Sequence, residues 1–130
     1  MILLDTHILI WWLDSPEKLS SPAATAIKDA YQDRILVSSF TAWEIAMLVS
    51  KDRLRLSIPV EIWLEKVEAI PFLSFIPATH DILVKSVFLS GTFHPDPADR
   101  IIVATALSQG CPLVTADEKI RDYGMIDTIW

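Results

Sequence analysis

Short apolar runs alternate with longer helical stretches along the whole chain, and this alternation limits the folds that the sequence can adopt. The runs of strand type are residues 2–4, 35–38, 73–76, 112–115 and 125–129. The stretches of helical type between them are residues 8–13, 21–31, 41–51, 59–70, 79–90, 97–109 and 118–123. Strands that alternate with helices predict an α/β fold, a mostly parallel central sheet of about five strands between two layers of helices.

The length and composition fit one folded domain over residues 1–130. Apolar residues make up 52% of the chain and charged residues 22%, which excludes a disordered or purely solvating segment. A chain of 130 residues buries roughly two-thirds of the surface of its unfolded state. A core of useful size is therefore expected.

Three features favour a soluble cytoplasmic protein. The longest apolar stretches, Ile8 to Leu13 and Ile101 to Leu107, are far shorter than the ~20 residues that cross a bilayer. The opening residues lack the basic region and cleavage site of a signal peptide. The single cysteine, Cys111, excludes an intrachain disulfide and a cysteine zinc cluster.

The net charge of −6 argues against a protein that coats nucleic acid non-specifically, because such binding depends on neutralising phosphates. It does not exclude a nuclease that uses a metal ion, since the cation restores the local charge balance. Basic residues also gather at Lys51, Arg53 and Arg55. They are candidates for contacts with RNA phosphates, with a solvated helix end as the simpler interpretation.

Two aspartates follow predicted strands at the edge where open parallel sheets bind ligands. Asp5 comes directly after the first strand, and Asp117 follows the fourth by two residues. Ligands in such folds bind beyond the carboxyl ends of the strands, at a topological switch point. The structural alternative for each aspartate is an N-cap of the next helix.

Glu44 lies on an apolar side of its predicted helix, where a carboxylate is unexpected. Its neighbours at i−4, i+3 and i+4 are Phe40, Met47 and Leu48. A buried, unpaired carboxylate costs several kcal/mol or takes up a proton. A salt bridge, or a position at the edge of the apolar side, would be the structural explanation.

Asp99 precedes an apolar helical run, with Asp96 one turn before it. Both lie near the amino end of the helix, where the dipole favours anions. Ordinary enrichment of acids at a helix start explains Asp96 better than a functional role does.

Carboxylates that converge on one cleft need a counter-charge, and a hard divalent cation supplies it. Mg²⁺, or Mn²⁺ as a substitute, suits an all-carboxylate set better than zinc. Such a cation can activate a water and orient a phosphodiester. Hydroxyls near the strand ends are candidates for supporting the site, although caps and turn bonds explain each one alone: Thr6, Ser38 and Thr115.

Four segments together resemble the PIN-domain family, and more narrowly the VapC-type toxins of bacterial toxin–antitoxin pairs. The segments begin with Leu-Leu-Asp5-Thr-His-Ile and Trp43-Glu44-Ile-Ala. They continue with Asp96-Pro-Ala-Asp99-Arg-Ile-Ile-Val-Ala-Thr-Ala and Leu-Val-Thr115-Ala-Asp117. Each motif is weak by itself, but the four occur in order from residue 2 to the carboxyl terminus.

The resemblance implies an α/β/α sandwich and a Mg²⁺-dependent endoribonuclease that acts as a toxin on cellular RNA. It implies homodimerisation and inhibition by a cognate antitoxin protein. It places the catalytic acids at Asp5, Glu44, Asp99 and Asp117. Asp5, Asp99 and Asp117 are the expected metal ligands, with Glu44 and Asp96 as further candidates.

Other interpretations remain for the chain and for some of its residues. The chain could be a catalytically inactive RNA-binding or interaction module on the same fold, although a pure binder gains nothing from concentrated negative charge. A phosphoaspartate receiver or a dehalogenase-type phosphatase is disfavoured, because the second acid of each is missing and His7 stands two residues after Asp5. His7 is interpreted as a helix-start residue that could still approach the site, and Arg100 as a partner for an acid. The tryptophans at positions 11, 12, 43 and 63 are expected in the core or at an interface.

Overall fold

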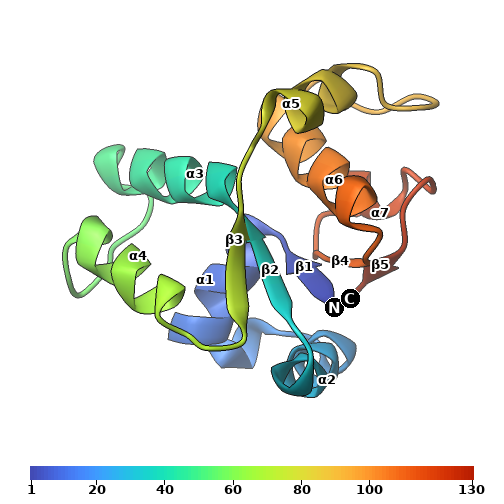
Figure 1. The fold of residues 1–130 in the computed structure, drawn as a ribbon. Coiled ribbons are helices and arrows are strands. Elements are labelled where there is room, and N and C mark those ends of the chain that lie inside the picture. Colours follow the sequence, from blue (N-terminus) through green and yellow to red (C-terminus); the bar gives the residue numbers. More distant parts are fainter.

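The computed structural model describes residues 1–130 and contains one five-stranded sheet between two helical layers (Figure 1). All neighbouring strands are parallel, and their order across the sheet is β3-β2-β1-β4-β5. The strands are β1 (Ile2–Leu4), β2 (Ile35–Ser38), β3 (Leu73–Ile76), β4 (Leu113–Val114) and β5 (Thr128–Ile129). The α/β fold predicted from the sequence is therefore confirmed.

Seven α-helices and two short 3-10 helices connect the strands. The α-helices are α1 (Thr6–Asp14), α2 (Ser21–Asp29), α3 (Ser39–Ser50), α4 (Val60–Glu68), α5 (His80–Val87), α6 (Pro97–Gln109) and α7 (Glu118–Arg121). The 3-10 helices are η1 (Pro16–Lys18) and η2 (Ala30–Gln32). None of the helices combines the length and apolar character needed to cross a membrane.

The alternation of side chains along β1 explains the two layers. Ile2 and Leu4 point into a core shared with helices α1 to α4, whereas Leu3 points into a second core with α6 and α7. Both faces of the central strands are thus covered, which is why these strands are apolar at every position except Ser38, the last residue of β2. The polar residues are left for the strand ends.

Local sequence signals fix several helix boundaries. Ser20 and Ser38 cap α2 and α3 by accepting hydrogen bonds from backbone N–H groups, and Asp96 caps α6 ahead of Pro97. Helix α6 ends at Gly110, whose φ of +63° is a left-handed conformation that suits glycine. Helix α3 begins directly after β2, at the carboxyl edge of the sheet, where Asp5 follows β1.

Several predicted boundaries differ from the observed ones. The predicted helix 21–31 stops at Asp29 and continues as the 3-10 helix η2, and the last strand contains only two of its five expected residues. Helix α5 ends at Val87 rather than at residue 90. The carbonyl groups of its last two residues, Ser86 and Val87, accept hydrogen bonds from the Arg100 side chain instead of continuing the helix.

Candidate active site

Asp5 lies at the carboxyl end of β1, in the middle of the sheet, and is 8% exposed. One carboxylate oxygen accepts a hydrogen bond from the N–H of Thr6 at 2.8 Å, which caps α1. The other accepts one from the hydroxyl of Thr115, also at 2.8 Å. The Thr115 oxygen in turn accepts the N–H of Asp117 at 3.1 Å, so β1 and the end of β4 are joined through the carboxylate.

Glu44 approaches the same place from the first half of α3. Its Oε1 accepts a hydrogen bond from the hydroxyl of Thr6 at 2.6 Å. The Thr6 oxygen lies 3.0 Å from the hydroxyl of Thr41, and because the Thr6 proton goes to Glu44, Thr41 is the donor to Thr6. Glu44 is thus half-buried and hydrogen-bonded, which resolves the conflict between its charge and its apolar neighbours.

The remaining acids come from α6 and from the loop before α7. Asp117 is the N-cap of α7 and accepts the N–H groups of Lys119 and Ile120 at 2.8 and 3.2 Å. Asp96 is the N-cap of α6 and is exposed, whereas Asp99, one turn later, is half-buried. The capping role expected as the alternative for Asp5 and Asp117 is therefore real, and it coexists with a position at the site. Asp96, expected only as an acid at a helix start, is a cap as well.

All the acids singled out from the sequence meet in one cavity of about 400 Å³. The cavity is lined by Asp5, His7, Ile8, Trp11, Glu44, Asp96, Asp99, Ala116 and Asp117. The structure thus brings together side chains that are as far as 112 positions apart in the sequence, counting from residue 5 to residue 117. It also places His7 at the cavity.

Burial raises the pKa of three of these carboxyl groups. The pKa of Asp5 is raised because the group is buried, and the hydrogen bonds from Thr115 and Thr6 offset part of that effect. Burial raises the pKa of Glu44 in the same way, against the hydrogen bond from Thr6. The pKa of Asp99 is raised to about 7, first by burial and then by the negative charges around it, of which Asp5 has the largest effect.

His94 is a residue of this region that the sequence did not single out. Its Nε2 lies 3.2 Å from an oxygen of Asp99, although the two are not aligned for a hydrogen bond. Its Nδ1 faces the N–H of Asp96 at 3.4 Å and would accept from it, which leaves the proton of a neutral ring on Nε2, toward Asp99. No metal-ligand spacing or motif marked His94, so only the fold could reveal it.

Arg100 holds the segment that carries His94. Its guanidinium group donates hydrogen bonds to the carbonyl oxygens of Ser86, Val87, Phe93 and His94, at 2.8 to 3.2 Å. The prediction that Arg100 pairs with an acid is therefore wrong. Four backbone acceptors satisfy the guanidinium instead, and it forms no ion pair with Asp99.

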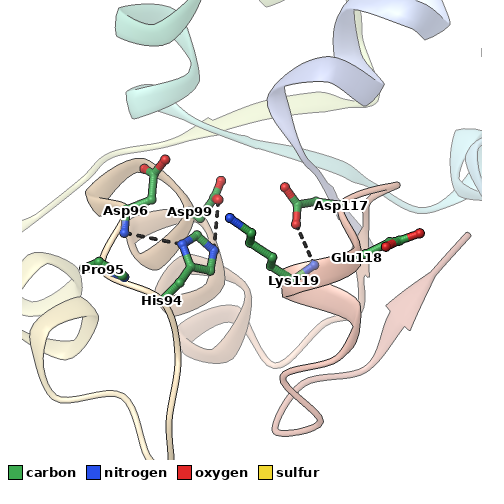
Figure 2. A pocket seen from close by; sticks show the side chains of 7 residues that line it. All are labelled: His94, Pro95, Asp96, Asp99, Asp117, Glu118 and Lys119. Atoms are coloured by element: carbon green, nitrogen blue, oxygen red, sulfur yellow. Dashed lines mark hydrogen bonds and ion pairs between the residues drawn. The ribbon is translucent and has the colours of Figure 1, made fainter.

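A second, wider cavity of about 760 Å³ adjoins the acid cavity and shares Asp96, Asp99 and Asp117 with it (Figure 2). Figure 2 shows Lys119 extending from α7 toward the space between Asp99 and Asp117, with His94 on the opposite wall. Lys119 is thus a cation at the edge of the acidic site. No sequence pattern predicted that Lys119, two residues after Asp117, would lie at this site.

The donor set fits a hard divalent cation, although the side chains are not already gathered around one point. No three of the acidic or histidine side chains are close enough together to hold a metal ion as they stand. Burial and the surrounding negative charges raise the pKa of Asp99, so a bound cation would favour the charged form of this carboxyl group. Carboxylate oxygens on one cavity wall are the ligands that Mg²⁺ and Mn²⁺ prefer.

The other predicted site residues are placed as follows. Thr6 and Thr115 each donate to an acid, whereas Ser38 accepts the N–H of Phe40 as a helix cap and contacts no acid. Lys51 ends α3, and Arg53 and Arg55 follow it in an exposed loop. Of the tryptophans, Trp63 is buried in the core, whereas Trp43 is 55% exposed.

Comparison with known proteins identifies the family. A model of the PIN domain matches residues 2–125. The chain is also 36% identical over 122 residues to the ribonuclease VapC22 of Mycobacterium tuberculosis, and this alignment covers 94% of the chain and 91% of that protein. The sequence resemblance to PIN domains of the VapC type is thereby confirmed.

Solved structures with a similar fold come from several bacterial complexes. VapBC2 of Rickettsia felis bound to a promoter DNA fragment has a TM-score of 0.68 at 18% identity, covering 98% of this chain and 97% of that chain. A toxin–antitoxin complex of Klebsiella pneumoniae has a TM-score of 0.67 at 24% identity, covering 100% and 97%. FitAcB of Neisseria gonorrhoeae has a TM-score of 0.68 at 19% identity, covering 98% and 96%. At these identities the likeness shows the fold alone, and with the sequence matches it shows that the chain belongs to the PIN-domain family.

Proposed function

We propose that this protein is a divalent-metal-dependent endoribonuclease, and that it is the toxin of a toxin–antitoxin pair. The observation that carries the proposal is the convergence of Asp5, Glu44, Asp99 and Asp117 on one cavity at the carboxyl edge of the sheet. The relationship to a ribonuclease of the VapC group supports the choice of RNA over other phosphodiesters.

In this proposal, different side chains bind the metal ion and position the attacking water. Asp5, Asp99 and Asp117 would hold Mg²⁺, or Mn²⁺ in its place, and Asp96 is a weaker candidate because its side chain is exposed. The cation, when bound, supplies a counter-charge and lowers the pKa of water. Glu44, oriented by the hydroxyl of Thr6, positions the water that attacks phosphorus while the bond to the leaving oxygen breaks.

Cleavage of total RNA with mapping of the cut sites tests the proposal. The wild-type chain should cut RNA in the presence of Mg²⁺ and should stop when EDTA is added. Asp5→Asn is the matched control, since asparagine keeps the size and the capping oxygen of Asp5 but removes its charge. Cleavage that continues unchanged in EDTA, or in Asp5→Asn, contradicts the proposal.

An antitoxin partner and a homodimer belong to the same proposal. The similar solved structures include a toxin–antitoxin complex and a VapBC2 structure, which supports a protein partner. Apolar side chains that a partner or second copy could cover are exposed on α5 and just after it: Val84, Val87 and Phe88. Light scattering tests the dimer, and a monomer at micromolar concentration contradicts it.

A non-catalytic RNA-binding module on this fold is the second candidate. The net charge of −6 and the concentration of acids in the cavity disfavour it. A chain that binds RNA but neither binds Mg²⁺ nor cuts any of a varied set of RNAs would establish this alternative.

A further inference from the structure

Next to the acid cavity lies a separate cavity of about 270 Å³ whose charged residues are mostly basic. Its charged lining residues are Asp14, Lys18, Arg53 and Arg55. The chain has 11 basic residues and a net charge of −6, so three cations around one small cavity are a marked local concentration. The loop after α3 and the helix η1 bring them together from different parts of the sequence.

The basic cavity and the acid cavity share one wall. Both are lined by His7 and Trp11, which lie one helical turn apart on α1. Their rings are 6.1 Å apart, and the ring of Trp130 lies 6.0 Å from that of Trp11 on another side. A bound strand that runs from the acids along α1 would therefore pass the imidazole of His7 and the indole of Trp11 before it reaches the cations.

The cations are available to a ligand. Lys18, Arg53 and Arg55 are all exposed, and the one ion pair among them, Arg55 with Asp52 at 3.4 Å, lies on the surface. Surface pairs of this kind contribute little and give way to a better partner. Asp14 reduces the positive charge but leaves an excess of cations at the cavity.

We infer that the cavity lined by Lys18, Arg53 and Arg55 is a subsite for the phosphate of an RNA nucleotide that flanks the cleaved bond, with His7 and Trp11 lining the passage between them. This inference rests on the proposed function. It gives the single-stranded RNA backbone a path across the molecule, which runs from the cations, past α1, to the acids. Basic grooves with aromatic side chains are the usual way in which proteins bind single strands.

Equilibrium binding of a single-stranded oligoribonucleotide tests the subsite without relying on cleavage. Measured in the Asp5→Asn chain, Arg53→Ala should weaken binding about five- to tenfold. It should also reduce the slope of log K against log salt by about 0.7, the value for one lost phosphate contact on a single strand. Lys28→Ala, which removes an exposed cation on α2, is the matched control and should leave both quantities unchanged.

Shortening the RNA locates the effect. With a substrate that extends on both sides of the cut, Arg53→Ala should raise KM with little change in kcat, and Arg53→Lys should restore most of the loss. When the substrate is trimmed from one end, the difference between wild type and Arg53→Ala should disappear at the length that removes the flanking phosphate.

The possible results separate the two proposals. Equal binding and equal salt slopes for Arg53→Ala and Lys28→Ala overturn the subsite, and so does a KM difference that persists on the shortest substrate. A wild-type chain that cuts no RNA overturns the proposed function, whereas the binding measurement still decides whether the cavity holds a phosphate.

Discussion

The two sides of the acid cavity hold their carboxylates in different ways. On the strand side, Asp5 and Glu44 each accept a threonine hydroxyl, and each hydroxyl accepts a further donor in turn. On the α6 side, Asp99 has no such donor, and its neighbour His94 is not aligned for a hydrogen bond. The strand side is therefore organised by the protein itself, whereas the α6 side depends on a proton or a cation.

Replacing Asp99 should have opposite effects on activity and on stability, and these effects should be the largest of those predicted here. Asp99→Asn removes a charge that the cation needs, and we expect cleavage to fall about a thousand-fold or more. The same change removes a carboxylate that burial and neighbouring charges disfavour, so the metal-free protein should melt at a higher temperature at pH 8. Cleavage rates and thermal melts in EDTA measure the two effects. A variant that is both inactive and less stable contradicts this view of the α6 side.

The stability of the metal-free protein should fall as pH rises from about 4 to about 7. Because the pKa of Asp99 is raised from 3.8 to about 7, the folded state keeps a proton that the unfolded state has released across this range. The free energy of unfolding should decrease by about 2–4 kcal/mol and then level off above pH 7. Urea unfolding in EDTA at pH 5 and pH 8 measures the decrease.

Mg²⁺ and Asp99→Asn provide the controls for this pH dependence. Saturating Mg²⁺ should remove most of the decrease, because it stabilises the folded state in which the carboxylates are charged. Asp99→Asn should remove most of it without metal. A metal-free wild type that is as stable at pH 8 as at pH 5 would show that this side of the cavity needs no counter-charge.

A substitution on the strand side should reduce activity less than Asp99→Asn does. The reduction should arise because the carboxylate of Asp5 is no longer held in its orientation. Thr115→Val removes the hydroxyl that joins Asp5 to the N–H of Asp117, and we expect metal affinity or activity to fall about 10- to 100-fold. Thr105→Val is the matched control, because Thr105 is equally buried but donates within α6 to the carbonyl of Ile101. Metal titration of both variants makes the comparison. Equal affinities would mean that the hydroxyl on Asp5 does not organise the site.

Asp96 should matter least among the acids. Asp96→Asn keeps a good cap for α6, and its exposed carboxylate contributes little to the cavity, so activity should stay within about threefold of wild type. Steady-state cleavage beside Asp99→Asn provides the comparison. If Asp96→Asn instead loses as much activity as Asp99→Asn, the metal is shared by both residues, and the two sides of the cavity are less distinct than described.

The sequence predicts the strand side of the site better than the α6 side. Asp5 follows an apolar run of strand type and Thr115 ends another, and parallel strands bring their carboxyl ends to one edge. The prediction of an α/β fold depends on the same pattern, which is strong because the central strands are covered on both faces.

The features that the sequence did not reveal depend on loops and long side chains. His94 reaches Asp99 only because Arg100 fixes the preceding segment through backbone carbonyls, which carry no sequence signal. Lys18 and Arg53 line the same basic cavity, and no local sequence pattern predicts that they lie near each other. The last strand is short because residues 125 and 126 form a bend after Gly124, whose φ is +77°, so that only Thr128 and Ile129 pair with β4.

The central position of β1 has a consequence for how the chain is made. The hydroxyl that orients Asp5 belongs to Thr115, 110 residues later in the chain, and β1 pairs with β4 only when that part of the chain exists. At ~5–20 residues per second, roughly 5–20 s separate the synthesis of the two residues. Contacts this distant in sequence also form slowly. A nascent chain therefore carries Asp5 without the hydroxyl that orients it, and the acidic site is complete only after Thr115 and Asp117 have been synthesised.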